Sequence, residues 1–325
     1  MTIKNLTRMY SPRWLSILKQ LDEGLLVITA SNRQADFLRQ QYRYYQQEMQ
    51  QGKTVWHSPS IITDKQWIIS LYQQYIINHG EENQAWILLS HQESQLIWEQ
   101  IIADDGDYLL DTRRTAERVR QAAERIHQWL LVDTITEDDS FNWREETRRF
   151  KQWHYLAAEQ CRENHWLEYY QLDQWLAERV HKLTDNSCSK LLPQKIGLLG
   201  FQQIAPARKL LLNGLKNLNI SMEILKPEAI VADIYRYEFA DSREEIKQAA
   251  IWAKQQWQEN PQQRLGIVIP NLNQNREMTR IIFERIFCPK QLLNSEDHIQ
   301  RPFDISLGLS LASYPLIDCA LMLMK

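Results

Sequence analysis

The chain has 325 residues, of which 44% are hydrophobic and 24% are charged, and its net charge is −3 at pH 7. These values are ordinary for a globular chain long enough for two domains, and they exclude a globally basic nucleic-acid-binding protein, so any basic surface must be local. The histidines show no metal-ligand spacing, and the four cysteines (Cys161, Cys188, Cys288 and Cys319) form no CxxC pair. We therefore expect no disulfide framework, no metal and no cofactor.

The sequence contains no secretory signal segment and no apolar run of 18 residues. These features predict a cytoplasmic protein without a membrane partner.

The first 80 residues alternate between the patterns of strands and helices. A continuous apolar run at Leu25–Thr29 predicts a buried parallel strand, and Ser31 and Asn32 are expected to begin the next helix. A second strand is predicted at Thr54–Trp56, followed by a helix from Asp64. This alternation predicts an α/β fold with a parallel sheet, and such sheets bind ligands at the carboxyl ends of their strands.

From residue 81 to residue 185 the strand patterns disappear and apolar residues recur at helical spacing, which predicts an all-helical insertion. Strand character returns at Lys195–Phe201, before a helix beginning at Pro206, and again at Ser221–Leu225. Two later strands are predicted, at Tyr235–Ala240 and Arg264–Ile269.

Two stretches have the outline of nucleotide-binding motifs but lack residues that those motifs need. Gly52-Lys53-Thr54 matches the end of a phosphate-binding loop, but Gln47 replaces the required glycine and a Gln-rich helix replaces the preceding strand. We interpret it as a helix end that enters a strand. Ile196–Pro206 (IGLLGFQQIAP) has the outline of a Walker-B segment, but Leu199 and Gly200 occupy the positions of its two acidic residues. The same stretch also fits a plain core strand followed by a polar turn. The sequence therefore argues against ATP hydrolysis.

Seven stretches, in order along nearly the whole chain, are similar to a family of bacterial DNA-repair proteins. They are VITASNRQADFLRQQY, VWHSPSIITDKQWIISLY, LLSHQESQLIWEQII, IGLLGFQQIAPARKLLL, DSREEIKQAAIWAKQQW, RLGIVIPNLNQNREM and FDISLGLSLASYPLIDCALMLM. On these stretches the chain resembles the N-terminal part of proteins related to the AddB and RecC subunits of helicase–nuclease complexes.

The resemblance implies a superfamily-1 helicase-like architecture. Residues 1–80 and 186–230 would form a first RecA-like (P-loop NTPase-like) domain, 81–185 its helical insertion, and 231–325 the start of a second RecA-like domain, truncated at its C-terminus. It also implies a catalytically inactive DNA-binding scaffold, often followed by a PD-(D/E)XK nuclease domain, which makes the full-length protein a candidate exonuclease. The implied partners are single-stranded or unwinding duplex DNA and a helicase or nuclease subunit.

The candidate DNA-binding residues come from the resemblance and from charge and aromatic patterns. In active family members a Thr-rich segment after a strand contacts single-stranded DNA, and Thr29 to Arg33 occupy the matching positions. The following helix carries arginines interleaved with tyrosines, and Trp56 and His57 lie in an aromatic loop. Basic and aromatic side chains of this kind can bind single-stranded DNA. The candidates are Thr29, Ser31, Asn32, Arg33, Arg39, Trp56, His57, Phe201 and Gln202.

Other interpretations of these residues stay open. The arginines also fit a solvated helix face with intrahelical ion pairs, and Trp56 fits a loop residue packed at a domain edge. At the level of function, the alternatives are a protein-docking scaffold without DNA contact and a nucleotide-binding α/β domain.

Overall fold

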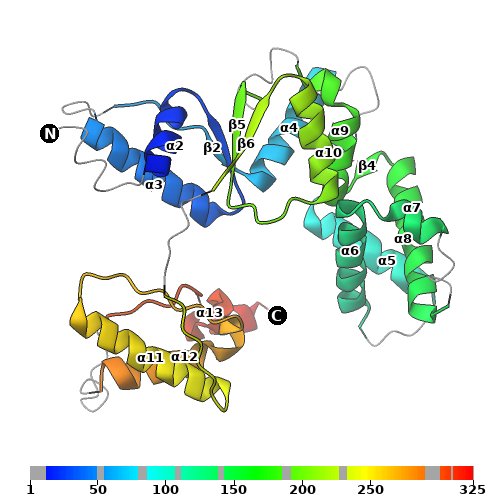
Figure 1. Cartoon of the computed structure of the whole chain (residues 1–325). Helices are drawn as coiled ribbons and strands as arrows, with labels where there is room; N and C mark the ends of the chain where they lie inside the picture. Colours follow the sequence, from blue (N-terminus) through cyan, green and yellow to red (C-terminus); the bar gives the residue numbers. More distant parts are fainter. Residues whose placement is uncertain are drawn as a thin grey trace. The chain divides into compact units, whose positions relative to one another are not determined.

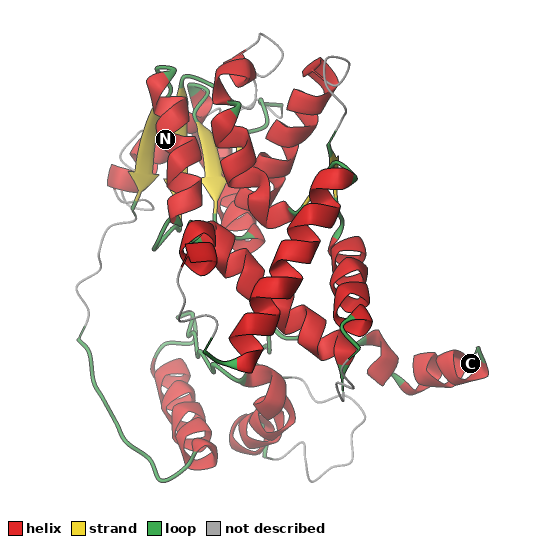
Figure 2. Cartoon of the chain, turned by 90° about the vertical axis from the view of Figure 1, so that its right-hand side faces the viewer, coloured by secondary structure: helices red, strands yellow, loops and turns green. Residues whose placement is uncertain are grey.

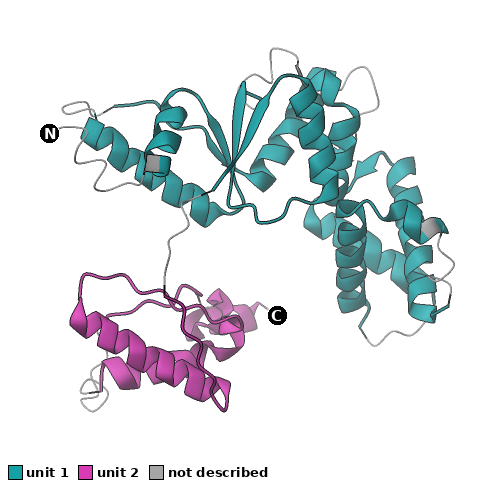
Figure 3. Cartoon of the chain, in the orientation of Figure 1, with its two compact units in different colours: residues 1–230 teal, residues 231–325 magenta. Residues whose placement is uncertain are grey.

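The computed structural model describes residues 12–49, 55–79, 86–106, 111–137, 143–184, 192–226, 233–289, 301–308 and 310–324. The chain divides into two compact units, 1–230 and 231–325 (Figure 3). None of the described helices is both long and apolar enough to cross a membrane.

A four-stranded parallel sheet forms the centre of unit 1, with the strand order β2-β1-β5-β6 (Figure 1). Thr29 at the end of β1 pairs with Thr63 on one side and with Leu199 on the other, so three strands end level with one another. The chain passes from β1 to β2 on one side and later to β5 on the other, so β1 ends at a topological switch point, where such sheets bind ligands. The strands are β1 (Leu26–Thr29), β2 (Ile61–Thr63), β5 (Lys195–Leu199) and β6 (Ser221–Leu225).

Helices cover both faces of this sheet (Figure 2), which is why β1 is a continuous apolar run. Leu26 and Ile28 point into one core, with α4, α9 and α10, whereas Val27 points into the other, with α2 and α3. The predicted α/β fold with a parallel sheet is confirmed. The covering helices are α2 (Pro12–Asp22), α3 (Asn32–Met49), α4 (Asp64–His79), α9 (Leu172–Glu178) and α10 (Pro206–Asn217).

The position of the second strand differs from the prediction. The described part of Thr54–Trp56 has no strand structure, and β2 begins only at Ile61. Both stretches are short and β-branched, and the one that hydrogen-bonds to β1 becomes the strand.

Between β2 and β5 the chain is mostly but not entirely helical. A third core holds Trp98 of α5 and Trp153 of α8, and Ser90 begins α5 with a capping box to Glu93. The expected absence of strands from 81–185 is wrong, because β3 (Ile87–Leu88) pairs in parallel with β4 (Trp166–Leu167). The remaining elements are α5 (His91–Asp104), α6 (Thr112–Gln128), α7 (Val132–Glu137), α8 (Glu145–Glu163), η2 (Tyr169–Gln171) and η3 (Val180–Thr184).

Unit 2 contains helices α11 (Ser242–Glu259), α12 (Leu272–Phe287) and α13 (Pro315–Leu323), and the short η6 (Leu311–Ser313). Its described residues form no strand, so the strands predicted at 235–240 and 264–269 are wrong. Ile267 and Ile269 pack against the core of α11 and α12, but Val268 is 91% exposed. Burial thus alternates along residues 264–269 as it would in a strand. The described part of this unit holds no neighbouring strand with which these residues could form hydrogen bonds.

Candidate nucleic-acid interface

The loops after β1 and β5 meet at the carboxyl edge of the sheet. The amide N–H of Ala30 donates to the carbonyl of Leu199 at 3.1 Å, which ties the two loops together. Only Ala30 and Ser31 separate β1 from α3, whose first residue is Asn32. A connection this short differs from the glycine-rich loop with which P-loop proteins surround a phosphate.

Thr29 and Ser31 form internal hydrogen bonds that shape this loop. Thr29 is buried, and its hydroxyl donates to the carbonyl of Ser31 at 3.1 Å. The Ser31 hydroxyl accepts from the backbone N–H of Gln34 at 3.3 Å, as a helix-capping side chain does. Asn32 and Arg33 follow in the first turn of α3, and both are exposed. Of these four predicted residues, Thr29 is buried, whereas Ser31, Asn32 and Arg33 are exposed, and the Ser31 hydroxyl is engaged as the cap of α3.

Gly200, Phe201 and Gln202 form the second loop, directly after β5. Gly200 has a φ of +84°, and a Cβ at this position would lie 2.2 Å from the side-chain amide of Gln34. Phe201 packs against the core on one face of the sheet, whereas Gln202 is exposed. The Oε1 of Gln34 is buried beside this glycine and has no hydrogen-bond partner in the described part of the chain.

Three helices begin at the same edge of the sheet, namely α3, α4 and α10. The first amide groups of a helix lack partners within the helix, and its dipole places partial positive charge there. This effect favours an anionic ligand such as a phosphate group at the start of α3, because α4 already begins with the carboxylate Asp64 and α10 with Pro206, which has no N–H.

Arg208 of α10 does not add a free cation to this edge. Its guanidinium donates to Asp173 of α9 at 2.5 Å and also to Asp64 at the start of α4. The Arg208 side chain is only 11% exposed, and its charge is offset by two carboxylates. This ion cluster holds three helices together, and the sequence analysis missed it because its members are far apart in the chain.

Arg39 lies further along α3 and connects that helix to β2. Its guanidinium donates to Asp36 at 2.8 Å and to the carbonyl of Ile61 at 2.9 Å. These contacts leave Arg39 partly exposed, with 42% of its side chain accessible to solvent.

Trp56 and His57 are not brought to the carboxyl edge. Both precede β2, and Ser60, between them and that strand, accepts a hydrogen bond from Val27 through its carbonyl. Because β1 and β2 are parallel, residues before β2 lie at the opposite, amino edge. Trp56 is half-buried against the core under α2 and α3, and His57 is exposed. Trp56 and His57, predicted as DNA-binding residues together with Thr29, therefore lie at a different edge of the sheet from Thr29.

Gln34 faces Gly200 across the two loops and was not among the residues predicted from the sequence. Glycine directly after a buried strand is a signal of a close backbone approach, and the chain has only nine glycines. Gly52-Lys53-Thr54 falls outside the described residues. In the described part of the chain no three His, Cys, Asp or Glu side chains are grouped so that they could hold a metal ion.

No model of a known protein family matches this chain, and a comparison with curated proteins found no match. The geometry of the site is therefore the basis for the function proposed next.

Proposed function

We propose that this chain is a helicase-like scaffold with a RecA-like sheet, lacks ATP hydrolysis, and serves a DNA-repair nuclease by binding single-stranded DNA. The carboxyl edge of the unit 1 sheet is the contact site. In this proposal Asn32, Arg33 and Gln202 contact the strand, while Thr29 and Ser31 hold the loop in shape.

The observation that carries the proposal is the junction of the two loops. It joins the exposed Asn32 and Arg33 to the loop of the exposed Gln202 through the Ala30–Leu199 hydrogen bond. Phosphate groups are attracted to helix starts, and amide side chains contact bases or sugars.

The proposed lack of ATP hydrolysis rests on two absences at this edge. The β1–α3 connection consists of two residues, and Leu199 and Gly200 replace the acids that would hold Mg²⁺ and polarise water. We expect ATP turnover at the background rate with or without single-stranded DNA. Turnover that Lys53→Ala abolishes would contradict this part of the proposal.

The DNA-binding test is fluorescence anisotropy with a short labelled single strand. We expect a dissociation constant in the micromolar range or weaker at low salt. Affinity should fall as salt rises, with a slope of about −0.7 per phosphate contacted. Arg33→Glu should weaken binding by about fivefold or more, because an attractive contact to phosphate becomes a repulsive one.

Arg43→Glu is the matched control for this test. Arg43 is also exposed and on α3, so the variant makes the same change in net charge, but it lies toward the other end of the helix. Equal weakening by the two variants would show that total charge, not the carboxyl edge, governs binding. Absence of binding at low salt would contradict the DNA-binding proposal itself.

A further inference from the structure

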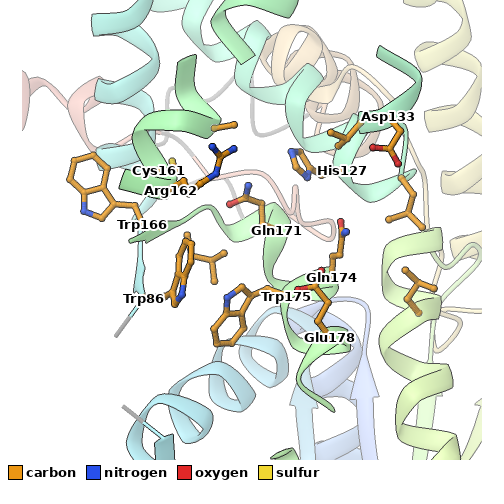
Figure 4. Close-up of a pocket in the computed structure, with 15 residues that line it drawn as sticks. Trp86, His127, Asp133, Cys161, Arg162, Trp166, Gln171, Gln174, Trp175 and Glu178 are labelled. Atoms are coloured by element: carbon orange, nitrogen blue, oxygen red, sulfur yellow. The ribbon is translucent and has the colours of Figure 1, made fainter. Parts of the chain in front are cut away.

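A pocket of about 520 Å³ lies in the helical part of unit 1 and shares no lining residue with the carboxyl edge of the sheet. We name it the indole pocket after Trp86, Trp166 and Trp175, which line it (Figure 4). Its other lining residues come mainly from α6, α7, α8, α9, α10 and η2. The volume lies within the range of pockets that hold small molecules.

Two of the indoles pack against a core and also line the pocket, and the Trp86 ring contacts the His165 ring at a centroid distance of 5.4 Å. Trp86 packs against the core of the sheet, and Trp166 packs against the core of α5, α6 and α8. Both are only partly buried, and both line the pocket. In Figure 4 they lie on one side of the pocket, with His127 on the other. An indole face of this kind stacks well on another planar ring.

Trp175 contributes a donor that is not used within the chain. The residue is 7% exposed, and its ring makes edge contacts with Tyr72 and Tyr75 at centroid distances of 5.8 and 5.0 Å. Its Nε1 is buried and has no hydrogen-bond partner in the described part of the chain. A buried indole N–H usually has a partner, so an acceptor on a ligand would satisfy it.

Gln171 supplies a second polar group on the pocket wall. Its Oε1 accepts from the backbone N–H of Glu168 at 3.0 Å, which leaves the amide nitrogen as its donor toward other groups. Indole N–H and amide NH₂ both donate, so a ligand with ring nitrogens or carbonyl oxygens matches this lining.

The pocket offers no excess of positive charge to a highly anionic ligand. Arg162 is its one positive lining residue, against Asp133 and Glu178, and Glu178 is paired with the neighbouring Arg179 at 3.1 Å. Burial, together with His154, lowers the pKa of His127 to about 4, so that imidazole is neutral at pH 7. Burial also raises the pKa of the Cys161 thiol to about 12. Such a lining disfavours a free triphosphate.

We propose that the indole pocket binds an uncharged planar nitrogen heterocycle of nucleobase size. The ring stacks on Trp86 or Trp166 and accepts a hydrogen bond from Trp175 Nε1. A free nucleoside and an unstacked base of a single strand share this chemistry. The second source, but not the first, rests on the proposed DNA-binding function.

The test is isothermal titration calorimetry of the full chain with adenosine, with cytidine and with a short single-stranded oligodeoxynucleotide. Trp166→Ala should weaken binding by about 5- to 100-fold, the range for losing one aromatic stacking platform. Trp175→Phe keeps the ring and removes only the N–H, and it should weaken binding by about tenfold. Circular dichroism and the melting temperature establish that each variant is folded.

Trp143→Ala is the control, because Trp143 is 83% exposed and does not line the pocket. Nucleoside binding that the two pocket variants weaken, and the control does not, supports the proposal with a free ligand as the source. The same pattern with the oligonucleotide alone supports a base of a single strand as the source.

Two results would overturn the proposal. One is that neither nucleosides nor the oligonucleotide bind. The other is that Trp175→Phe and Trp166→Ala bind as the control does. If, in the second case, oligonucleotide binding still weakens with Arg33→Glu, the indole pocket is rejected while the proposed function stands.

Discussion

Gly200 is the residue on which the junction of the two loops depends. Its φ of +84° lies in the left-handed region, and the Gln34 amide occupies the space where a side chain would begin. The left-handed backbone therefore favours glycine here, and an added Cβ would force the flexible end of the Gln34 side chain to shift.

We expect Gly200→Ala to lower the free energy of unfolding by about 2 kcal/mol, of which roughly 1 kcal/mol is the conformational cost. Adding Gln34→Ala should recover the steric part but not the conformational part. Urea unfolding of the two variants separates these terms. A double variant no more stable than Gly200→Ala would mean that the Gln34 contact does not matter.

His127 should make unit 1 sensitive to acid. Burial and His154 lower its pKa to about 4, and burial also lowers the pKa of His154, so folding favours the neutral imidazoles. The unfolded chain, with His near 6.5, binds more protons as pH falls from 6.5 to 4. Stability is therefore complete above pH 6.5, and His127 alone should cost up to about 3 kcal/mol near pH 4.

The measurement is the free energy of unfolding at pH 7.5 and at pH 4.5. His127→Gln, which cannot take up a proton, should lose less stability over this interval than the parent chain. His57→Gln, at an exposed position, should follow the parent. If His127→Gln and the parent lose the same free energy of unfolding between these pH values, His127 is not the source of the acid sensitivity.

At the scale of elements, α4, α9 and α10 are joined by the ion cluster of Arg208 with Asp64 and Asp173. Removing one member of a buried cluster leaves the others without compensation. We expect Arg208→Met to lower the free energy of unfolding by about 3–5 kcal/mol, and the exposed neighbour Lys209→Met to change it by less than about 0.5 kcal/mol.

A further pair of substitutions tests whether the uncompensated carboxylates cause the loss of stability in Arg208→Met. Asp64→Asn and Asp173→Asn remove the two uncompensated charges, so adding both to Arg208→Met should restore part of the loss. If they destabilise the variant further, packing of the Arg208 side chain, which lies near the Trp67 ring, outweighs its charge.

Elements with their own local signals were predictable from the sequence. The apolar run of β1, the capping residue Ser31 and the Pro206 start of α10 each determine local structure through residues close in the chain. The position of β2 and the ladder of β3 with β4 were not predictable, because strands of two or three residues are defined by their partners.

The candidate site was predictable to the same extent as its strands. Residues following β1 and β5 lie together, because parallel strands end at one edge. The second strand was predicted at Thr54–Trp56, which would place Trp56 and His57 at the carboxyl end of a strand. Because β2 is Ile61–Thr63, both residues precede it and lie at the opposite edge of the sheet. Gly200 after a buried strand signals a close approach, but a single sequence has no signal that Gln34 is the residue that approaches it.

At the scale of the whole molecule, the chain consists of two units with separate cores. We expect them to unfold in separate steps, because each core melts according to its own packing. Only Trp252 and Trp257 of the 12 tryptophans belong to unit 2, so fluorescence reports chiefly on unit 1, whereas far-ultraviolet circular dichroism reports on both. The two probes should give transitions with different midpoints, and coincident transitions would contradict independent unfolding.

The extended segments of unit 2 have a consequence for the protein during storage and handling. Ile234 is 93% exposed and Val268 is 91% exposed, in two stretches that were predicted as strands or adjoin one and that have no strand partner in the described part of the unit. Such stretches are templates for pairing between chains, and a lysine in them opposes that pairing. Aggregation in concentrated solution should therefore begin in unit 2, where Val268→Lys would slow it with little cost to the fold.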